Sequence, residues 1–294
     1  MAMRILRFGI AAARHAARIA LVLALGAVLG ATLVRLAPGF GSSEEDLDSR
    51  LSRESIEALR QQRAADENLA AYYLHSLTRL AHGDLGESRL LNQPVRQLLA
   101  ERFPETLKSV AAGLALAWML GFPLAAAAVM GRARVVDWLA SLGMSLLVCI
   151  PAAVLALLFV IARAPARFAV GLIVLPKVFT YARGLLARSS EMPHVLAARA
   201  RGAGTLRILL RHILPVSAPQ LFALAGISLT LAFAAAVPVE ALCDLPGIGQ
   251  LAWKAAMERD LNLLVNLTML VTLITVVANS AASLAGEPSR GGAR

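Results

Sequence analysis

From residue 19 onward the chain consists of long apolar runs separated by short charged segments, apart from one long polar stretch at residues 36–105. A helix needs about 20 mostly apolar residues to cross the hydrocarbon core of a bilayer. The pattern therefore predicts an all-α polytopic membrane protein with about six transmembrane helices. The predicted spans are Ile19–Val34, Ser109–Gly131, Trp138–Ala162, Phe168–Ala182, Ile213–Val239 and Leu261–Gly286. The fourth is the weakest, because it is short and contains Pro176 and Lys177.

The first predicted span, Ile19–Val34, is short and lies between Arg18 and Arg35. It is long enough to cross a bilayer if both arginine side chains extend toward the interfaces. A basic N-terminus followed by an apolar run could also be a cleaved signal peptide. However, residues 35–39, Arg-Leu-Ala-Pro-Gly, lack the small-x-small cleavage pattern, so a retained span is the preferred interpretation.

The composition supports a membrane protein. Hydrophobic residues make up 58% of the chain and charged residues 16%, whereas a soluble protein carries about 25% charged residues. The two cysteines, Cys149 and Cys243, are far apart, so neither a disulfide framework nor a metal cluster is predicted. The net charge of +10 could indicate nucleic-acid binding, but a membrane protein also carries basic residues on its cytoplasmic side. The location of the basic residues distinguishes the two.

Six spans place both termini on one side of the membrane, and the basic residues favour the cytoplasmic side. The inner segments are then 1–18, 132–137, 183–212 and 287–294. They are rich in arginine and contain few acidic residues, although Arg163 and Arg167 on the outer side oppose this assignment. The net charge is thus mainly a signal of topology, and no nucleic-acid partner is predicted.

The order of apolar and polar segments predicts four regions. Residues 1–36 form a cytoplasmic N-terminus and the first span, and residues 37–105 form an extracytoplasmic helical segment. Residues 106–286 form a core of five spans, with a cytoplasmic loop at 183–212 and an extracytoplasmic loop at 240–260. Residues 287–294 form a cytoplasmic tail.

The loop between the fourth and fifth spans contains a basic, glycine-interrupted segment, "LAARARGAGTLRILLRHILP", at residues 196–215. We predict a first short helix that Ser190 caps and that carries Pro193 in its first turn. Gly202 is the expected C′ residue that ends it. Its predicted apolar edge consists of Val195, Leu196 and Ala200.

A second helix is predicted to begin at Thr205, as its N-cap, and to lead into the fifth span. It is amphipathic, with Arg207 and Arg211 opposite the apolar residues Leu206, Leu209, Leu210 and Ile213. Such a helix can lie in the membrane interface or dock into a groove of another protein. A loop that only fixes topology is the alternative, but it would need charge and no defined pair of helices.

At these residues the chain resembles the membrane permease subunits of ABC importers. Their cytoplasmic signature is Glu-Ala-Ala, three residues, Gly, nine residues and Ile-x-Leu-Pro. Ala197-Ala198 precede Gly202 at this spacing, and residues 212–215, His-Ile-Leu-Pro, follow it. Leu196 replaces the glutamate and His212 the isoleucine. The segment is more similar to the version found in dipeptide, oligopeptide and nickel permeases, "ARAKG" followed by "LLRHAL".

Four further segments resemble the same subfamily, in the same order along the chain. "VRLAPG" at 34–39 is similar to "LRLAPGDP", with Phe40-Gly41 replacing Asp-Pro. "HGDLGESRLLNQPVRQLLAERFPETLKSV" at 82–110 and "VEALCDLPGIGQLAWKAAMERDLNLL" at 239–264 resemble the outer segments of these permeases. The end, Glu-Pro-Ser-Arg at 287–290, is similar to the usual Asp-Pro-Arg.

The resemblance implies a type I ABC importer permease in the cell inner membrane, forming half of a pathway for peptides or related solutes. It also implies a second homologous permease subunit in a heterodimer, two cytoplasmic ATPases and an extracytoplasmic solute-binding protein. The chain contains no G-x-x-x-x-G-K-[ST] phosphate loop, so ATP and magnesium are expected on partner subunits and no cofactor on this chain.

The resemblance also assigns roles to two groups of residues. The contact with the ATPases is expected at Met192, Leu196, Ala197, Ala198, Arg199, Gly202, Gly204, Leu214 and Pro215. The arginines could instead attract lipid headgroups. A re-entrant turn that faces the binding protein is expected at Leu245, Pro246, Gly247, Ile248 and Gly249, with an ordinary surface turn as the alternative.

Two other classes of function are less compatible with the sequence. A self-sufficient secondary carrier would show internal repeats and charged residues near the membrane midplane, and neither is visible. A membrane-embedded enzyme would need a nucleophile–base pair or an H-E-x-x-H motif within a span, and the sequence contains neither. The sequence does not distinguish dipeptides, oligopeptides, nickel chelates or other solutes as the substrate.

Overall fold

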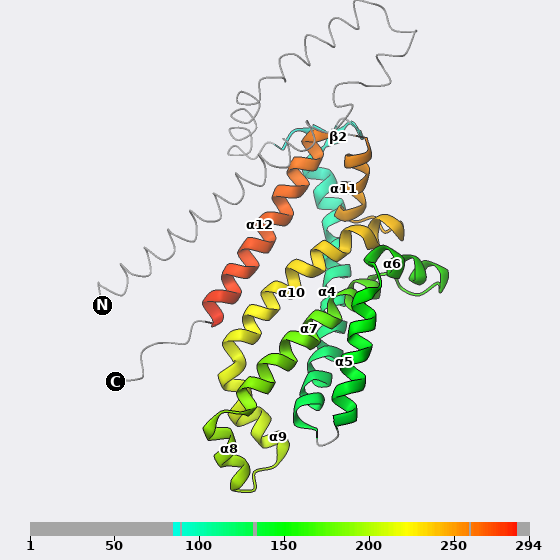
Figure 1. Cartoon of the computed structure of the whole chain (residues 1–294). Coiled ribbons are helices and arrows are strands. Elements are labelled where there is room, and N and C mark those ends of the chain that lie inside the picture. Colours follow the sequence, from blue (N-terminus) through cyan, green and yellow to red (C-terminus); the bar gives the residue numbers. More distant parts are fainter. Residues whose placement is uncertain (1–84, 89, 132–133, 259, 287–294) are drawn as a thin grey trace, which may run out of the picture. The chain divides into compact units, whose positions relative to one another are not determined.

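The computed structural model describes residues 85–88, 90–131, 134–258 and 260–286. The predicted first span, most of the predicted extracytoplasmic segment 37–105 and the tail 287–294 lie outside the described residues. The helices are α4 Val95–Met130, α5 Arg134–Cys149, α6 Ala152–Ile161, α7 Arg167–Ser190, α8 Pro193–Ala200, α9 Thr205–Ile208, α10 Leu214–Leu242, α11 Ile248–Met257 and α12 Leu261–Gly286 (Figure 1). A π-helical turn, Leu209–Ile213, joins α9 to α10, and the strands β1 Glu87–Ser88 and β2 Gln93–Pro94 form a short hairpin.

Four helices are long and apolar enough to cross a membrane, and a bent pair provides a fifth span if it counts as one. The four are Val95–Met130, Arg167–Ser190, Thr205–Leu242 and Asn262–Ala282. Each overlaps a span that the apolar runs predict. The predicted all-α, multi-pass membrane fold is therefore confirmed, with the two-residue strands as a small addition among the described residues.

The predicted third span, Trp138–Ala162, folds as two helices and not as one. The chain bends by 94° between α5 and α6, at Ile150–Pro151. Proline has no N–H to donate and disfavours helical geometry at the residue before it, which explains a break at this position. Because the apolar run continues on both sides of Pro151, hydrophobicity alone does not reveal the bend.

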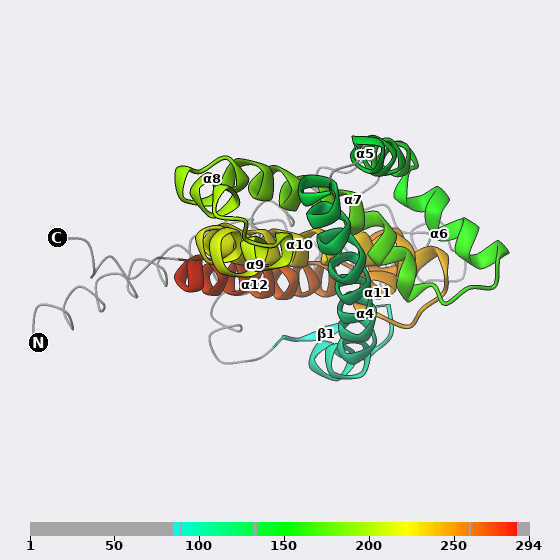
Figure 2. The same ribbon diagram turned by 90° about the horizontal axis from the view of Figure 1, so that it is seen from below.

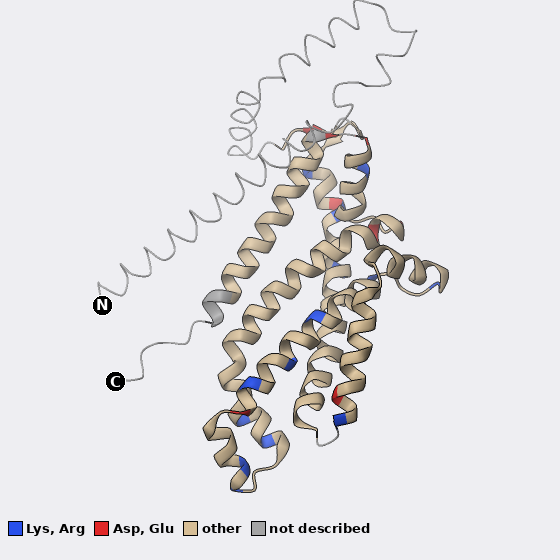
Figure 3. Cartoon of the chain, in the orientation of Figure 1, with Lys and Arg blue, Asp and Glu red and all other residues tan. Residues whose placement is uncertain are grey.

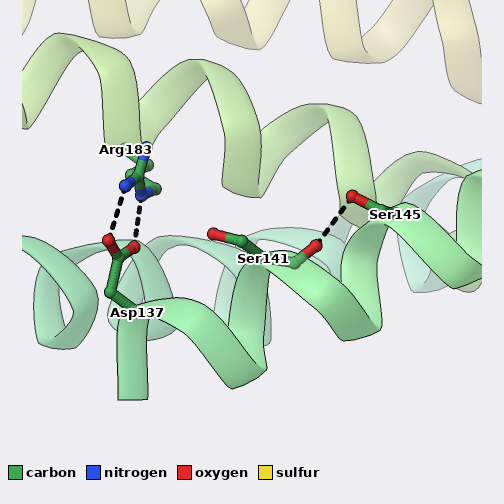
Figure 4. A network of polar contacts seen from close by, with 4 residues as sticks. All are labelled: Asp137, Ser141, Ser145 and Arg183. Carbon is green, nitrogen blue, oxygen red and sulfur yellow. Dashed lines mark hydrogen bonds and ion pairs between the residues drawn. The ribbon is translucent and has the colours of Figure 1, made fainter. Parts of the chain in front are cut away.

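The fourth span is longer than predicted, since α7 continues eight residues beyond Ala182 to Ser190. Arg183 lies in this extension, and its guanidinium donates two hydrogen bonds to Asp137 of α5, at 2.5 and 2.6 Å (Figure 4). The predicted span ends at Ala182 because the next residue, Arg183, is charged. In the structure Arg183 belongs to the helix, and its charge is paired with Asp137. The two-pronged contact joins the beginning of α5 to α7.

The chain divides into two compact units, Met1–Glu101 with Ala252–Thr272 and Arg102–Leu251 with Leu273–Arg294. In the second unit α7 contacts both α5 and α10. Seen from below (Figure 2), α8 and α9 lie at one end of this unit and α6 at the other. A buried cluster of Phe179, Leu186, Val195, Ile208 and Ile213 connects α7 to the α8–α9 end.

Glycines allow close helix contacts within the second unit. A Cβ on Gly171 of α7 would lie 2.8 Å from the Gly113 oxygen of α4 and 2.7 Å from a Leu116 methyl group. In α10, a Cβ on Gly226 would lie 2.9 Å from Ala282. Small residues at such contacts let transmembrane helices approach each other closely. Gly226 thus lies at a close contact between α10 and α12.

Candidate functional site

The segment that carries the cytoplasmic signature folds as two short helices joined at a glycine. Met192, in an extended conformation (φ −67°, ψ 144°), precedes α8, and Pro193 takes its first position. The predicted capping role of Ser190 is wrong, because Ser190 is the last residue of α7 and donates its hydroxyl to the Ala187 oxygen. Proline at the first helical position is favoured, since its missing N–H would have no partner there.

Gly202 ends α8 with a positive φ of 77°, which confirms its predicted role as the C′ residue. The Ala203 N–H donates to the Ala198 oxygen at 3.1 Å, and the Gly202 N–H donates to the Arg199 oxygen at 2.9 Å. These two bonds are the pattern of a Schellman motif, which glycine favours because it has no Cβ to clash. The direction of the chain after α8 is therefore determined by Gly202.

The inner side of α8 differs from the predicted apolar edge. Val195 and Ala198 are buried, whereas Leu196 and Ala200 are exposed, so the prediction is wrong for two of its three residues. Val195 and Ala198 are three positions apart and lie on one side of the helix. That side packs into the cluster that also contains Leu186 of α7.

The predicted apolar face of the second helix is correct for the buried Ile213 and wrong for Leu206 and Leu210. Leu206 and Leu210 are 67% and 53% exposed, while Ile208 and Ile213 are buried. The π-helical turn Leu209–Ile213 departs from the 3.6-residue period on which the prediction relied. The N-cap is Gly204 rather than the predicted Thr205.

Most residues predicted to contact an ATPase share one outward surface at the α8–α9 end, which we call the α8–α9 surface. The exposed members are Met192, Leu196, Ala197, Arg199, Gly202, Gly204 and Pro215; Leu214 is half-buried and Ala198 is buried. Arg201, Arg207 and Arg211 are exposed on the same segment, so basic residues gather there (Figure 3). This surface combines apolar side chains with positive charge and suits a protein groove with acidic residues.

The second predicted site, the turn Leu245–Gly249, lies between α10 and α11. Asp244 enters it with a positive φ of 51°, and the Gly247 N–H donates to the Leu245 oxygen at 2.7 Å. Pro246 is exposed and Leu245 half-buried, whereas Gly247, Ile248 and Gly249 are buried. Only the first two residues of the turn are therefore open to a partner.

The buried half of this turn binds a carboxylate that the sequence pattern does not reveal. Glu240 of α10 is fully buried, and its Oε2 accepts hydrogen bonds from the Gly249 N–H at 2.7 Å and the Thr106 hydroxyl at 3.0 Å. The Ile248 N–H donates to the same Thr106 oxygen at 2.8 Å. The sequence predicts an outer loop at residue 240. A lone acidic residue at the end of an apolar run was the available signal.

A second buried carboxylate, Asp260, joins two of the segments that carry the family resemblance. Its Oδ2 accepts hydrogen bonds from the Ser88 hydroxyl at 2.6 Å and the Leu90 N–H at 3.1 Å, and its Oδ1 accepts from the Leu263 N–H. Asn262 adds a bond from its amide to the Glu87 oxygen at 2.8 Å. Asp260 therefore caps α12 and holds the β1–β2 hairpin at the same time.

We expect Asp260→Ala to release the β1–β2 hairpin. Loss of an N-cap costs about 1 kcal/mol, and the two bonds from the hairpin would also be lost. Hydrogen exchange across residues 85–94 should accelerate about tenfold or more. Asp260→Asn keeps a capping oxygen and should accelerate it less, and equal exchange in wild type and Asp260→Ala would show that other contacts hold the hairpin.

Comparison with known proteins places this geometry among transport proteins. Residues 113–286 match the family model of binding-protein-dependent transport system inner membrane components. The oligopeptide transport system permease protein of Escherichia coli K12 is 28% identical and aligns over 81% of this chain and 84% of its own length. The nickel import system permease protein of Staphylococcus aureus is 27% identical, over 80% and 76%.

A solved structure shows the same fold. A chain of a methionine ABC transporter in an inward-facing conformation superposes with a TM-score of 0.54 at 20% sequence identity. The match covers 64% of this chain and 96% of that chain. Among the residues that the structure describes, no group of histidine, cysteine and acidic side chains is arranged to hold a metal ion.

Proposed function

Because the chain belongs to the family of binding-protein-dependent transport system inner membrane components, and is a permease subunit of an ABC importer, we propose that it forms half of a translocation pathway for peptides or related small solutes. Relatives named for oligopeptide and for nickel import support this solute range. Permease subunits of such importers are not enzymes, since separate ATPase subunits hydrolyse ATP. ATP and magnesium then bind to those subunits, and this chain needs no cofactor of its own.

The α8–α9 surface is the proposed contact with the ATPases. The observation that supports this role most strongly is the Schellman motif at Gly202, which gives the basic segment a defined shape. A segment that only fixed topology would need its arginines but no rigid joint. The exposed Leu196 and Leu206 provide apolar contacts, and the arginines provide complementarity to an acidic groove.

The proposed topology has both termini in the cytoplasm. The concentration of arginine on the α8–α9 segment supports a cytoplasmic location for it (Figure 3). The turn Leu245–Gly249, at the other end of α10, then faces the extracytoplasmic side. The exposed Pro246 and the half-buried Leu245 are the proposed contact with the solute-binding protein. The regions 1–36, 37–105, 106–286 and 287–294 are proposed to have the roles that the sequence predicts, except that α4 begins at Val95, within the second region.

The family places the chain in an importer with ATPase and binding-protein partners. We further propose that its membrane partner is a different but homologous permease chain, so that the pathway forms between two unlike halves. Lipid surrounds the assembly, and no nucleic acid takes part. Two ATPases, one for each permease, complete the complex.

Copurification tests this proposal directly. A tagged full-length chain, expressed together with the genes beside it and purified in mild detergent, should bring with it two ATPases and a second permease. Mass spectrometry would identify them, and native mass would give their ratio. A chain purified in folded form without any ATPase would overturn the proposal, and two copies of this chain alone with the ATPases would overturn its heterodimeric part.

A further inference from the structure

Three segments of the second unit meet at the side chain of Glu240. Its Oε2 accepts from Thr106 of α4 and from the backbone of Gly249, and Thr106 in turn accepts from the backbone of Ile248. Glu240 is 0% exposed and Thr106 is 1% exposed. The carboxylate and the hydroxyl thus hold the inner half of the turn against both α4 and α10. We call this arrangement the Glu240 clamp.

The turn is shaped to admit this carboxylate. A Cβ on Gly249 would lie 2.8 Å from the Glu240 oxygen and 2.7 Å from the Val237 Cα, and a Cβ on Gly247 would overlap the same oxygen. Two glycines of the Pro-Gly-Ile-Gly sequence therefore leave the space that the carboxylate occupies. The sequence predicts these glycines for a sharp turn, and the structure adds that they make room for Glu240.

Glu240 also lies at the far end of the helix that begins at the α8–α9 surface. The helical path runs without a break from Thr205 to Leu242. The α10 part alone has 29 residues, which corresponds to about 43 Å at 1.5 Å per residue. A displacement of α9 can therefore be transmitted to Glu240 through continuous helical backbone. The Glu240 clamp would then transmit the displacement to the turn Leu245–Gly249.

We propose that Glu240 is a positioning residue that fixes the turn Leu245–Gly249 to α4 and α10, so that the half-buried Leu245 and the exposed Pro246 move together with the transmembrane helices during transport. This inference rests on the proposed function for the movement, although the clamp itself does not depend on it. The role requires a hydrogen-bond acceptor at position 240.

The bonding of the carboxylate indicates that the acceptor matters more than the charge. The hydrogen bonds from Thr106 and Gly249 both use Oε2, and Oε1 is buried without a hydrogen-bond partner among the described residues. A glutamine could present its amide oxygen in place of Oε2. Glu240→Gln should therefore retain the clamp. Glu240→Ala removes the acceptor and leaves the Gly249 N–H and the Thr106 hydroxyl without this partner.

The first experiment measures the turn itself by hydrogen exchange in the purified full complex. In Glu240→Ala the peptide containing the Ile248 and Gly249 amides should exchange about tenfold faster, as expected for loss of a buried hydrogen bond. Thr106→Val is the second variant, since it removes the shared hydroxyl with little change in volume. Glu240→Gln and Thr106→Ser should stay close to wild type, and the exposed Glu258→Ala is the matched control for loss of an acidic residue.

The second experiment measures uptake of a radiolabelled peptide mixture by cells that express each variant at equal membrane level. Glu240→Ala and Thr106→Val should lose most of the uptake, with the ATPases still copurifying, and Glu240→Gln should restore it. Unchanged exchange at Ile248 and Gly249 in both Glu240→Ala and Thr106→Val would overturn the clamp. A loosened turn with normal uptake would overturn its role in transport. Wild-type chain that brings down no ATPase would overturn the proposed function and leave the exchange result valid.

Discussion

Gly202→Val should abolish solute uptake while the protein still reaches the membrane. Gly202 has a φ of 77°, a conformation that costs other residues about 1–2 kcal/mol and a β-branched residue more. No atom lies within 4 Å of a Cβ built there, so the effect arises from backbone conformation and not from crowding. The variant should lose the Schellman motif and redirect the chain after α8. Uptake in cells and membrane-fraction immunoblots would measure both parts.

Two control variants distinguish the backbone conformation of Gly202 from a general sensitivity of this segment to substitution. Gly202→Asn should keep much of the uptake, since asparagine tolerates a positive φ. Gly204→Ala should be close to neutral, because Gly204 has an ordinary φ of −66° and open space where its Cβ would be. Normal uptake by Gly202→Val would remove the support for a defined joint at the α8–α9 surface.

Gly171→Ala should destabilise the helical bundle. In most helices the change from glycine to alanine stabilises by up to about 1 kcal/mol. At Gly171, however, the new Cβ would lie 2.8 Å from the Gly113 oxygen and 2.9 Å from the Leu116 Cβ, so α4 and α7 must separate. Overpacking of this kind costs roughly 1–3 kcal/mol. The apparent melting temperature in detergent and the yield of monodisperse protein should both fall.

The same helix provides a matched control for this substitution. Gly184 lies in α7 as well, and a Cβ built there meets no atom within 4 Å. Gly184→Ala should therefore leave the melting temperature unchanged or raise it slightly. If both variants behaved alike, the close approach of α4 and α7 at Gly171 would not contribute to stability as described.

The amino-acid sequence is enough to identify a multi-pass helical membrane protein of the ABC permease type. Runs of about 20 apolar residues have few alternatives to spanning a bilayer, since the backbone must satisfy its own hydrogen bonds there. The C′ role of Gly202 could also be predicted from the sequence, because a glycine after a short helical pattern is a local signal for the end of a helix. The order of the motifs along the chain indicated the family.

Other features depended on contacts between residues far apart in the chain. The chain bends by 94° at Pro151, whereas Pro123 and Pro219 remain inside helices. All three prolines lie in apolar runs, so the sequence does not show which of them breaks a helix. Similarly, Leu206 and Leu210 are exposed although the helical pattern predicts them on the apolar face, and the helix departs from the α-helical period at the π-helical turn Leu209–Ile213. A prediction from local patterns assumes a constant helical period, whereas the period in the folded protein can vary along a helix.

The two buried carboxylates depend most clearly on contacts that form only in the folded protein. Glu240 and Thr106 are separated by 134 positions, and Asp260 and Ser88 by 172. Both acids fall at the ends of the predicted outer loop 240–260, and the sequence does not identify the donors that surround them. Folding instead surrounds each with donors from distant segments, because a buried carboxylate is stable only where several N–H and O–H groups converge on it.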